Sequence, residues 1–557
     1  MTERTGVVLS GHPASPGVAA GPALRMVAPP QLPADMPAVT DEATEIDRVG
    51  RALATVAEQL EARAAEATGQ AAEVLDAQAL MAGDSGLLES AVEAVRTGRP
   101  APWAVVTAIT GFQRSLAEAG GYFAERVGDL DDLANRAIAW LLDQPMPGLP
   151  TSDEPYVLVA VDLAPADTVA LESASVLAIV TERGGPTSHT AILAKAAGLP
   201  AVVNCPDAAT IADGDRVIVD AHRGQLVLRP TDDEVEQALS AERRRTAAYA
   251  AVSGPGRTAD DHRVSLLLNL GTESGIEAAA KVDAEGVGLF RTEFLFLDRS
   301  SAPDQAEQQR IYANLFRSFA NRTVVVRTLD AGSDKPLAFV TQPDEPNPAL
   351  GVRGFRTAKA FPELLDTQLT AISLAAKDSD ADVRVMAPMI STAREAEEFG
   401  DLVRSHGLPV AGVMIEVPAA ALHADRLLAG VDFVSIGTND LSQYTFAADR
   451  GLAGLADLLD PWQPALLELV AATAGAGKRL GKPVGVCGEA ASDPLLAPVL
   501  VGLGVTSLSM SPPAVAAARA ALRQHTLASC ASLAERVLAA DGPQQARELA
   551  LAAGRQD

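Results

Sequence analysis

The sequence predicts a multidomain α/β protein that ends in a (β/α)8 barrel of the TIM type. It begins with a smaller β/α domain that carries an inserted helical bundle. The chain has 557 residues, more than the roughly 100 to 200 of one ordinary domain. Between residues 258 and 557, short apolar segments alternate with helical stretches, as in a ring of strand-plus-helix units.

The expected barrel strands share short apolar cores that end in polar residues. They are residues 265–270, 286–290, 323–330, 384–390, 411–417, 433–440, 483–489 and 507–511. In such a barrel the carboxyl ends of the strands line one face, where active sites lie. The polar residues at most of these strand ends are therefore predicted to converge in one pocket. They include Asn269, Arg291, Glu293, Arg327, Asp330, Glu416, Asn439, Asp440, Cys487 and Glu489.

The first half of the chain shows strand-like and helical patterns in turn. The strand candidates are residues 156–161, 176–180, 200–204, 216–220 and 225–230. The N-terminal segment shows the same pattern of short strands and turns. We expect residues 1–37 and 143–230 to form one β/α domain, and 38–142 to be the inserted helical bundle. Residues 231–257 read as a linker helix ending in a turn cluster, before the barrel at 258–557.

Charge and composition exclude several classes of partner. With 45 basic and 72 acidic residues the formal net charge is −27, which disfavours nucleic acid and anionic membranes. Neither a signal pattern nor an apolar run of membrane-spanning length occurs, so a cytoplasmic protein without membrane insertion is expected. The helical region from Asp41 to Trp140 holds 17 acidic and 8 basic residues. This excess indicates either a solvated surface or a docking face for a basic partner.

Cations and carboxylates gather at the predicted strand ends and the adjoining loops. The cations are Arg291, Arg327, Lys335, Arg353 and Arg450. Guanidinium groups match phosphate or carboxylate, although surface ion pairs are the alternative for any single arginine. Glu416 and Asp440 are suited to hold Mg²⁺ together with water and a substrate phosphate, or else they pair with the arginines. Cys487 is either a buried structural thiol or a proton donor in this pocket.

A histidine follows a glycine-rich turn in the smaller domain. Gly184, Gly185 and Pro186 form the turn, Thr187 or Ser188 caps a helix, and His189 opens it. The positive end of a helix favours a phosphoryl group on the ring, whereas a histidine without function is the alternative. The exposed turn and the flanking hydroxyl groups favour a nucleophile.

These segments resemble the phosphoenolpyruvate-utilising enzymes. GGPTSHTAILAKAAGLPAVV is similar to their phosphohistidine signature. Other segments resemble the barrel motifs of enzyme I of the phosphoenolpyruvate:sugar phosphotransferase system. They are GVGLFRTEFLF, RTLDAGSDKPL, NPALGVRGFR, GVMIEVPAAAL, FVSIGTNDLSQYTFAADR and VCGEAASD. The resemblance extends over essentially the whole chain in the right order.

The resemblance implies a role for each matching residue. His189 would be the phosphorylated nucleophile, steadied by Thr187 and Ser188. Cys487 would protonate the enolate that becomes pyruvate, and Glu416 and Asp440 would ligate Mg²⁺. The residues that would hold the phosphate and carboxylate of phosphoenolpyruvate are Arg291, Arg327, Lys335, Arg353, Asn439 and Arg450.

The resemblance also implies partners and a cellular task. His189 would pass its phosphoryl group to the histidine-containing phosphocarrier protein HPr, docked on the helical insertion, in the first step of sugar uptake. The phosphohistidine domain would travel on the 231–257 linker, and the barrel would form a homodimer.

Several rival functions are weighed against this reading. The dikinase and synthase relatives need a nucleotide-binding domain, for which no glycine-rich loop or spare segment exists. A phosphoenolpyruvate or pyruvate barrel lyase has no use for the His189 domain, and a non-catalytic regulatory phosphoprotein has no use for the barrel residues. A nitrogen-branch paralogue would carry an extra sensory domain before the enzyme I pattern.

Overall fold

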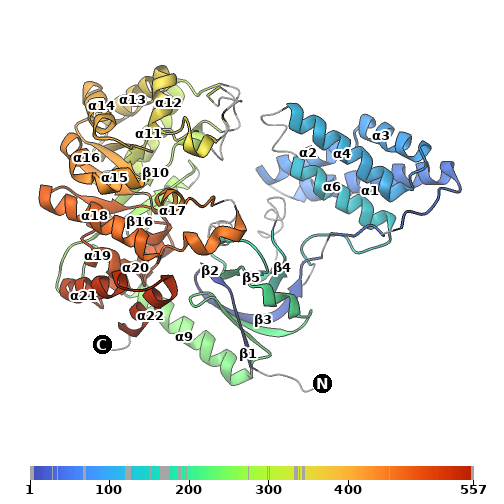
Figure 1. The fold of residues 1–557 in the computed structure, drawn as a ribbon, viewed down its shortest axis with the longest axis horizontal. Helices are drawn as coiled ribbons and strands as arrows, with labels where there is room; N and C mark the ends of the chain where they lie inside the picture. The colour runs from blue at the N-terminus through green and yellow to red at the C-terminus, as the bar shows by residue number, and fades with distance from the viewer. Residues whose placement is uncertain are drawn as a thin grey trace. The chain divides into compact units, whose positions relative to one another are not determined.

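The computed structural model describes most of the chain and divides it into two compact units, residues 1–243 and 244–557 (Figure 1). The described residues are 6–27, 29–33, 35–66, 70–119, 127–150, 152, 154–163, 175–185, 190–191, 194, 197–273, 275–297, 299, 301–331, 337, 339–340, 345, 347–450 and 452–553. No helix within these ranges is long and apolar enough to cross a membrane.

The first unit contains an eight-stranded mixed sheet with the order β1-β8-β7-β3-β4-β5-β6-β2. The strands are β1 (Val7–Ser10), β2 (His12–Ser15), β3 (Val18–Arg25), β4 (Tyr156–Ala160), β5 (Val176–Thr181), β6 (Ala201–Val203), β7 (Arg216–Asp220) and β8 (Gln225–Leu228). Strands β3 to β6 pair in parallel, and their central members β4 and β5 are buried almost throughout. Such continuous apolar runs are typical of strands that are covered on both faces.

A helical group lies between β3 and β4 in the chain. Its helices are α1 (Glu42–Glu66), α2 (Gln70–Ala82), α3 (Ser85–Arg96), α4 (Ala101–Ala119) and α6 (Val127–Leu141). Their buried alanine, leucine and valine side chains form one core cluster. Asp84 caps α3, because its carboxylate accepts the N–H of Leu87 at 3.0 Å. The predicted insertion of helices into a β/α domain is thus confirmed as a fold class.

Helix α9 (Asp232–Ala250) follows the sheet. Its residues up to Arg243 belong to the first unit, and its later residues belong to the second. A capping box starts it: the Glu234 N–H donates to Thr231 Oγ1 at 3.3 Å, and the Thr231 N–H donates to Glu234 Oε2 at 2.7 Å. On the side of the first unit, His222 Nε2 lies 3.1 Å from Glu242 Oε2.

The second unit is a closed barrel of parallel strands, as predicted. The strands are β9 (Ser265–Leu270), β10 (Gly286–Phe290), β11 (Thr323–Arg327), β12 (Asp382–Ala387), β13 (Ala411–Ile415), β14 (Phe433–Ile436), β15 (Val484–Val486) and β16 (Ser507–Met510). The expectation that strands continue to 330 and 440 is wrong. Strand β11 ends at Arg327, and β14 ends at Ile436 because a helix begins two residues later, at Thr438.

Helices cover the outside of the barrel (Figure 1). They are α10 (Ile276–Ala280), α11 (Gln305–Ser318), α12 (Phe355–Ala360), α13 (Pro362–Lys377), α14 (Ala393–Ser405), α15 (Pro418–Leu422), α16 (Ala424–Gly430), α17 (Thr438–Phe446), α18 (Pro464–Leu480), α19 (Ala497–Gly502), α20 (Ala514–Leu522), α21 (Leu527–Leu538) and α22 (Pro543–Ala553). Inside, a separate apolar cluster of residues from five strands, together with Cys487 just after β15, fills the barrel: Leu289, Val325, Met386, Met414, Phe433 and Cys487. The barrel is therefore a packed core that presents its strand ends as a platform.

Candidate active site

Arg327 is the last residue of β11, so a rigid strand positions its side chain at the carboxyl face of the barrel. Its Nη2 donates to Glu293 Oε1 at 2.9 Å. Its Nη1 lies 3.5 Å from Asp330 Oδ2 and 3.7 Å from Glu416 Oε1. The side chain is only 10% exposed, and a charge so deeply buried is tolerated because carboxylates pair with it.

Arg353 reaches the same place from a turn rather than from a strand. The turn lies between the 3-10 helix Pro348–Leu350 and α12. Its Nε and Nη2 donate to Asp330 Oδ1 at 3.3 Å and Oδ2 at 2.8 Å, while Nη1 donates to Asp440 Oδ1 at 3.0 Å. Gly354 makes this turn with φ +58°, and a Cβ there would meet Met389 Cβ at 2.7 Å.

Glu416 follows β13 and is almost completely buried. It accepts the N–H of Met389 at 2.9 Å. A Cβ at Gly437 would lie 2.8 Å from Glu416 Cγ, so glycine lets the start of α17 approach this carboxylate closely. Burial, followed by the neighbouring Asp440 and Asp330 carboxylates, raises the pKa of Glu416 to about 8 despite Arg327. The nearby arginines therefore compensate the ionised form of Glu416 only in part.

Glu416 and Asp440 fit a hard divalent cation in their chemistry. Both offer carboxylate oxygens and interact electrostatically. Mg²⁺ accepts one or two carboxylates when water and substrate oxygens complete its octahedron. Among the described residues, no group of three or more histidine, cysteine, aspartate and glutamate side chains is arranged to hold a metal. The two carboxylates therefore suit a cation that is shared with the substrate, not one in a closed protein cage.

The remaining predicted residues of the barrel lie around this pair. Arg450 Nη1 is 3.6 Å from Asp440 Oδ2. Asn439 Oδ1 accepts the N–H of Glu489 at 3.0 Å, which joins the first turn of α17 to the 3-10 helix Glu489–Ser492 that follows β15. Arg291 directly follows β10 and acts electrostatically on the Cys487 thiol. The predicted convergence of these strand ends is therefore what the fold produces.

Charges of both signs meet at the strand ends. The four described arginines are Arg291, Arg327, Arg353 and Arg450, and the four buried carboxylates are Glu293, Asp330, Glu416 and Asp440. Pairing with carboxylates, which was the alternative to substrate and metal binding, occurs for Arg327, Arg353 and Arg450. An anion that enters this cluster meets carboxylates as well as arginines, and a divalent cation would supply further positive charge.

Three buried polar atoms in this cluster have no hydrogen-bond partner within the described part of the chain. They are Glu293 Oε2, Arg327 Nε and Thr438 Oγ1. Buried polar groups without partners are costly and therefore rare, and they concentrate where a ligand completes them. At the strand ends, these three atoms are available to a ligand bound at this face of the barrel.

Cys487 lies just beyond β15 at the top of the barrel interior. Its thiol contacts Ile436 O at 3.6 Å. Burial raises the pKa of the Cys487 thiol to about 11, although the Ser435 hydroxyl and the Arg291 and Arg327 charges oppose this shift. At neutral pH the group is thus a thiol, which is the form that donates a proton.

Several residues of the site were not predicted with a role. Glu293 and Asp330 were noted only as polar strand-end residues, yet they supply the principal partners of Arg327 and Arg353. Tyr444 on α17 accepts a hydrogen bond from Arg353 Nη1 at 3.1 Å, and its hydroxyl donates to Ala349 O. No periodicity in the sequence marks Tyr444, because its contact depends on the path of the 347–353 turn.

Four predicted residues lie outside the described residues: His189, Thr187, Ser188 and Lys335. Around the first three, Gly184 adopts φ +94°, and residues 190, 191, 194 and 197 are helical. Gly198 follows with φ +67°, which agrees with the expected helix stop. The helix start at His189 stays a prediction.

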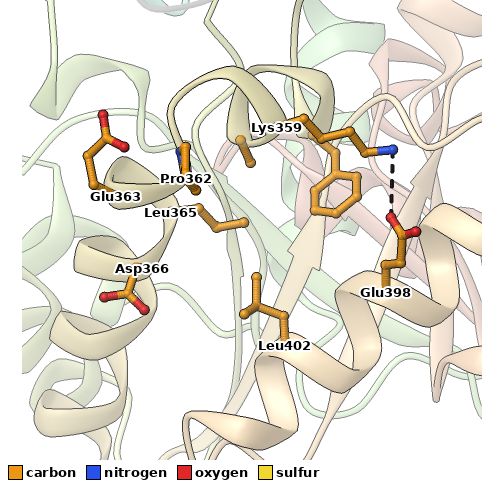
Figure 2. A pocket seen from close by; sticks show the side chains of 9 residues that line it. Lys359, Pro362, Glu363, Leu365, Asp366, Glu398 and Leu402 are labelled. Carbon is orange, nitrogen blue, oxygen red and sulfur yellow. Dashed lines mark ion pairs between the residues drawn. The ribbon is translucent and has the colours of Figure 1, made fainter.

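One hollow, the outer hollow, lies on the outside of the barrel between α12, α13 and α14 (Figure 2). Its volume is about 420 Å³, and Phe355, Leu365 and Leu402 supply apolar lining. Lys359 lies 3.6 Å from Glu398, and both side chains are more than a third exposed. No residue with a predicted catalytic or binding role lines it.

Comparison with known proteins identifies the family. Models of the PEP-utilising enzymes match at residues 10–126 (N-terminal), 152–224 (mobile domain) and 246–527 (PEP-binding domain). The chain is 50% identical over 552 residues to a phosphoenolpyruvate-protein phosphotransferase of Streptomyces coelicolor, with 98% of each chain covered. A protein of the same name from Haloferax volcanii is 40% identical, covering 87% of this chain and 88% of the relative. Another from Bacillus sp. strain S is 37% identical, covering 95% of each.

The strand-end cluster and these matches together define the class of protein. The chain belongs to the PEP-utilising enzymes and, among them, to the enzyme I group of phosphoenolpyruvate-protein phosphotransferases.

Proposed function

We propose that this chain transfers the phosphoryl group of phosphoenolpyruvate to its own His189 and then to the histidine of the phosphocarrier protein HPr. Pyruvate is released, and the reaction is the first step of sugar uptake by the phosphotransferase system. One observation carries the barrel half of this proposal. Buried Arg327 and Arg353 lie beside buried Glu416 and Asp440 at the strand ends of a closed barrel.

The substrate is held by its two anionic ends. Arg291, Arg327, Lys335, Arg353, Asn439 and Arg450 bind its phosphate and carboxylate groups. Glu416 and Asp440 hold the divalent cation that this family generally needs, and we assign that cation as Mg²⁺. When bound, the cation neutralises charge on the transferring phosphoryl group. Guanidinium groups and orphaned polar atoms at the site support this assignment.

The transfer itself requires alignment more than covalent help. Nε2 of His189 attacks phosphorus, and the bond between phosphorus and the enol oxygen breaks with its electron pair left on that oxygen. Thr187 and Ser188 steady the ring. The resulting enolate takes the thiol proton of Cys487 at carbon and becomes pyruvate. The raised pKa of Cys487 supports this role, because the thiol is kept protonated until the more basic enolate forms.

Each part of the chain has its own role in this scheme. Residues 1–37 and 143–230 carry His189, the helices of 38–142 dock HPr, and residues 258–557 bind phosphoenolpyruvate and form the homodimer contact. Residues 231–257 act as the hinge, since His189 has two partners to reach. This is supported by the family model described as the mobile domain, which matches 152–224, and by the capped helix α9 that follows it.

Labelled phosphoenolpyruvate tests the proposal directly. Wild-type protein with Mg²⁺ is expected to take up acid-labile label, release pyruvate and pass the label to HPr. The His189→Ala variant is the matched control and should do none of these. Equal pyruvate release by the control would instead support a barrel lyase. Absence of both label and pyruvate in the wild type would favour a regulatory phosphoprotein.

A further inference from the structure

Asp330 occupies a central place among the strand-end charges that no role assigned above explains. It lies three residues beyond the end of β11, and its side chain is 5% exposed. Its Oδ2 lies 2.8 Å from Arg353 Nη2 and 3.5 Å from Arg327 Nη1. One carboxylate oxygen is therefore shared by two guanidinium groups, which would repel each other without it.

The two arginines differ in what holds them. Arg327 starts from a strand, and the barrel ladder sets its direction. Arg353 starts from a turn, so its aim depends on side-chain contacts. Asp330 provides the most extensive of these, because both of its oxygens bind two nitrogens of the same guanidinium. Such a two-point contact sets the plane of an arginine as well as its position.

The third nitrogen of Arg353 is also occupied. Its Nη1 donates to Asp440 Oδ1 at 3.0 Å and to the Tyr444 hydroxyl at 3.1 Å. Asp440 is also one of the two proposed cation ligands. Its Oδ1 cannot interact fully with the cation and with Arg353 Nη1 at the same time. When a cation and an anionic substrate enter, the Nη1 edge is the part of Arg353 that changes partner. The Asp330 contact lies on the other edge and is unaffected by that exchange.

We propose that Asp330 is a positioning residue that fixes the spacing and plane of Arg353 relative to Arg327 while the Nη1 edge passes from Asp440 to the substrate anion. This rests on the function proposed above. Asp330 does not touch the substrate in this scheme; it acts through the arginines. Its removal should therefore weaken phosphoenolpyruvate binding more than it slows the chemical step.

The test compares Asp330→Asn and Asp330→Glu with Asp366→Asn, an exposed aspartate of the outer hollow. Asparagine keeps the shape and loses the charge, whereas glutamate keeps the charge and displaces it by one methylene. We expect KM for phosphoenolpyruvate to rise about 10-fold to 100-fold in Asp330→Asn, with a smaller fall in kcat. Asp330→Glu should lie between, and Asp366→Asn should match the wild type.

A binding measurement gives the affinity for phosphoenolpyruvate without turnover. In the His189→Ala background, which cannot be phosphorylated, calorimetric titration with phosphoenolpyruvate and Mg²⁺ should show the same loss of affinity for Asp330→Asn. Phosphoryl transfer from phosphorylated HPr back to His189 does not use the barrel site. It should stay at the wild-type rate in the Asp330 variants, which shows that they are folded.

Each outcome has one meaning. A wild-type KM in either Asp330 variant overturns the proposal, as does a fall in kcat with unchanged KM. If Asp330→Asn does not fold, Asp330→Glu decides by the same criterion. Wild-type protein that binds no phosphoenolpyruvate and forms no phosphohistidine would instead overturn the proposed function itself.

Discussion

The strand-end cluster and the outer hollow both combine cations with carboxylates, but their surroundings differ. At the strand ends, the ion-paired side chains of Arg327, Arg353 and Glu416 are at most 10% exposed. In the hollow, Lys359 is 53% exposed and its partner Glu398 is 39% exposed. The pKa of Glu416 is raised by burial, whereas that of Glu398 is lowered, first by its hydrogen bond from Arg394.

This difference shows why only one of the two clusters has the character of a catalytic site. Water screens the exposed pairs, so they contribute little and perturb little. The buried groups have lost water and depend on one another, so that any new ligand must change the balance of the whole cluster. Strong perturbation together with depth is the pattern expected of functional groups.

The largest effect is expected from Arg327→Met. Three carboxylates would lose their shared cation, and breaking buried pairs in this way costs about 3–5 kcal/mol of stability. Pyruvate release should become undetectable. Urea unfolding and a coupled pyruvate assay measure both effects. Wild-type activity in this variant would contradict the proposed role of Arg327.

Cys487→Ala should give the next largest effect, here on rate alone. Loss of a general acid slows the step by about 10²–10⁴-fold. Cys530 is the matched control: it is also fully buried and its pKa is raised by burial to about 12, but it lies on α21. Stopped-flow pyruvate formation should be slow only in Cys487→Ala. Equal slowing by Cys530→Ala would mean that packing, not proton donation, sets the rate.

The effect of pH on stability is expected to be smaller over any one pH unit. Because the folded-state pKa of Glu416 is raised from 4.5 to about 8, its protonated form is favoured in the fold. The stability that Glu416 contributes is then fully present below about pH 4.5 and is lost as pH rises towards 8, by at most about 1.4 kcal/mol per pH unit.

Urea unfolding of the cation-free protein across this range measures the slope. Glu416→Gln should flatten it, and added Mg²⁺ should reduce it by stabilising the ionised form. Glu398→Gln should leave it unchanged, since the lowered pKa of Glu398 places its titration below this range. A slope of the same size in Glu416→Gln would locate the titrating group elsewhere.

The smallest effect is expected from Lys359→Met in the outer hollow. Its ion pairs with Glu395 and Glu398 are partly exposed, at 3.8 and 3.6 Å. Stability and kcat/KM should both stay within error of the wild type. A clear loss of activity would show that the hollow is coupled to Arg353 through α12.

Most of the fold could be predicted because it depends on local patterns. The apolar runs at 265–270 and 286–290 coincide with β9 and β10, since strands buried on both faces need continuous apolar residues. Strand ends were less predictable. The run that continues past Ile436 looks like one strand, but the pairing of β14 with its neighbours stops there and α17 begins.

The candidate site divides in the same way. Parallel strands in a closed barrel bring their carboxyl ends together, so the gathering of Arg327, Glu416 and Asp440 follows from the sequence once the strands are identified. The roles of His189, Thr187, Ser188 and Lys335 stay predictions from motif and resemblance.

The sequence by itself determined which elements form, how they close, and which chemical groups stand at the strand ends. Only the tertiary structure decided which of these groups pair. Arg353 binds Asp330, 23 residues earlier, and Asp440, 87 residues later. Such pairs depend on the paths of turns across the barrel mouth and on the exclusion of water there, and residue spacing encodes neither. Burial at the barrel mouth raises the pKa of Glu416. In the same buried cluster, Asp330 pairs with both Arg327 and Arg353.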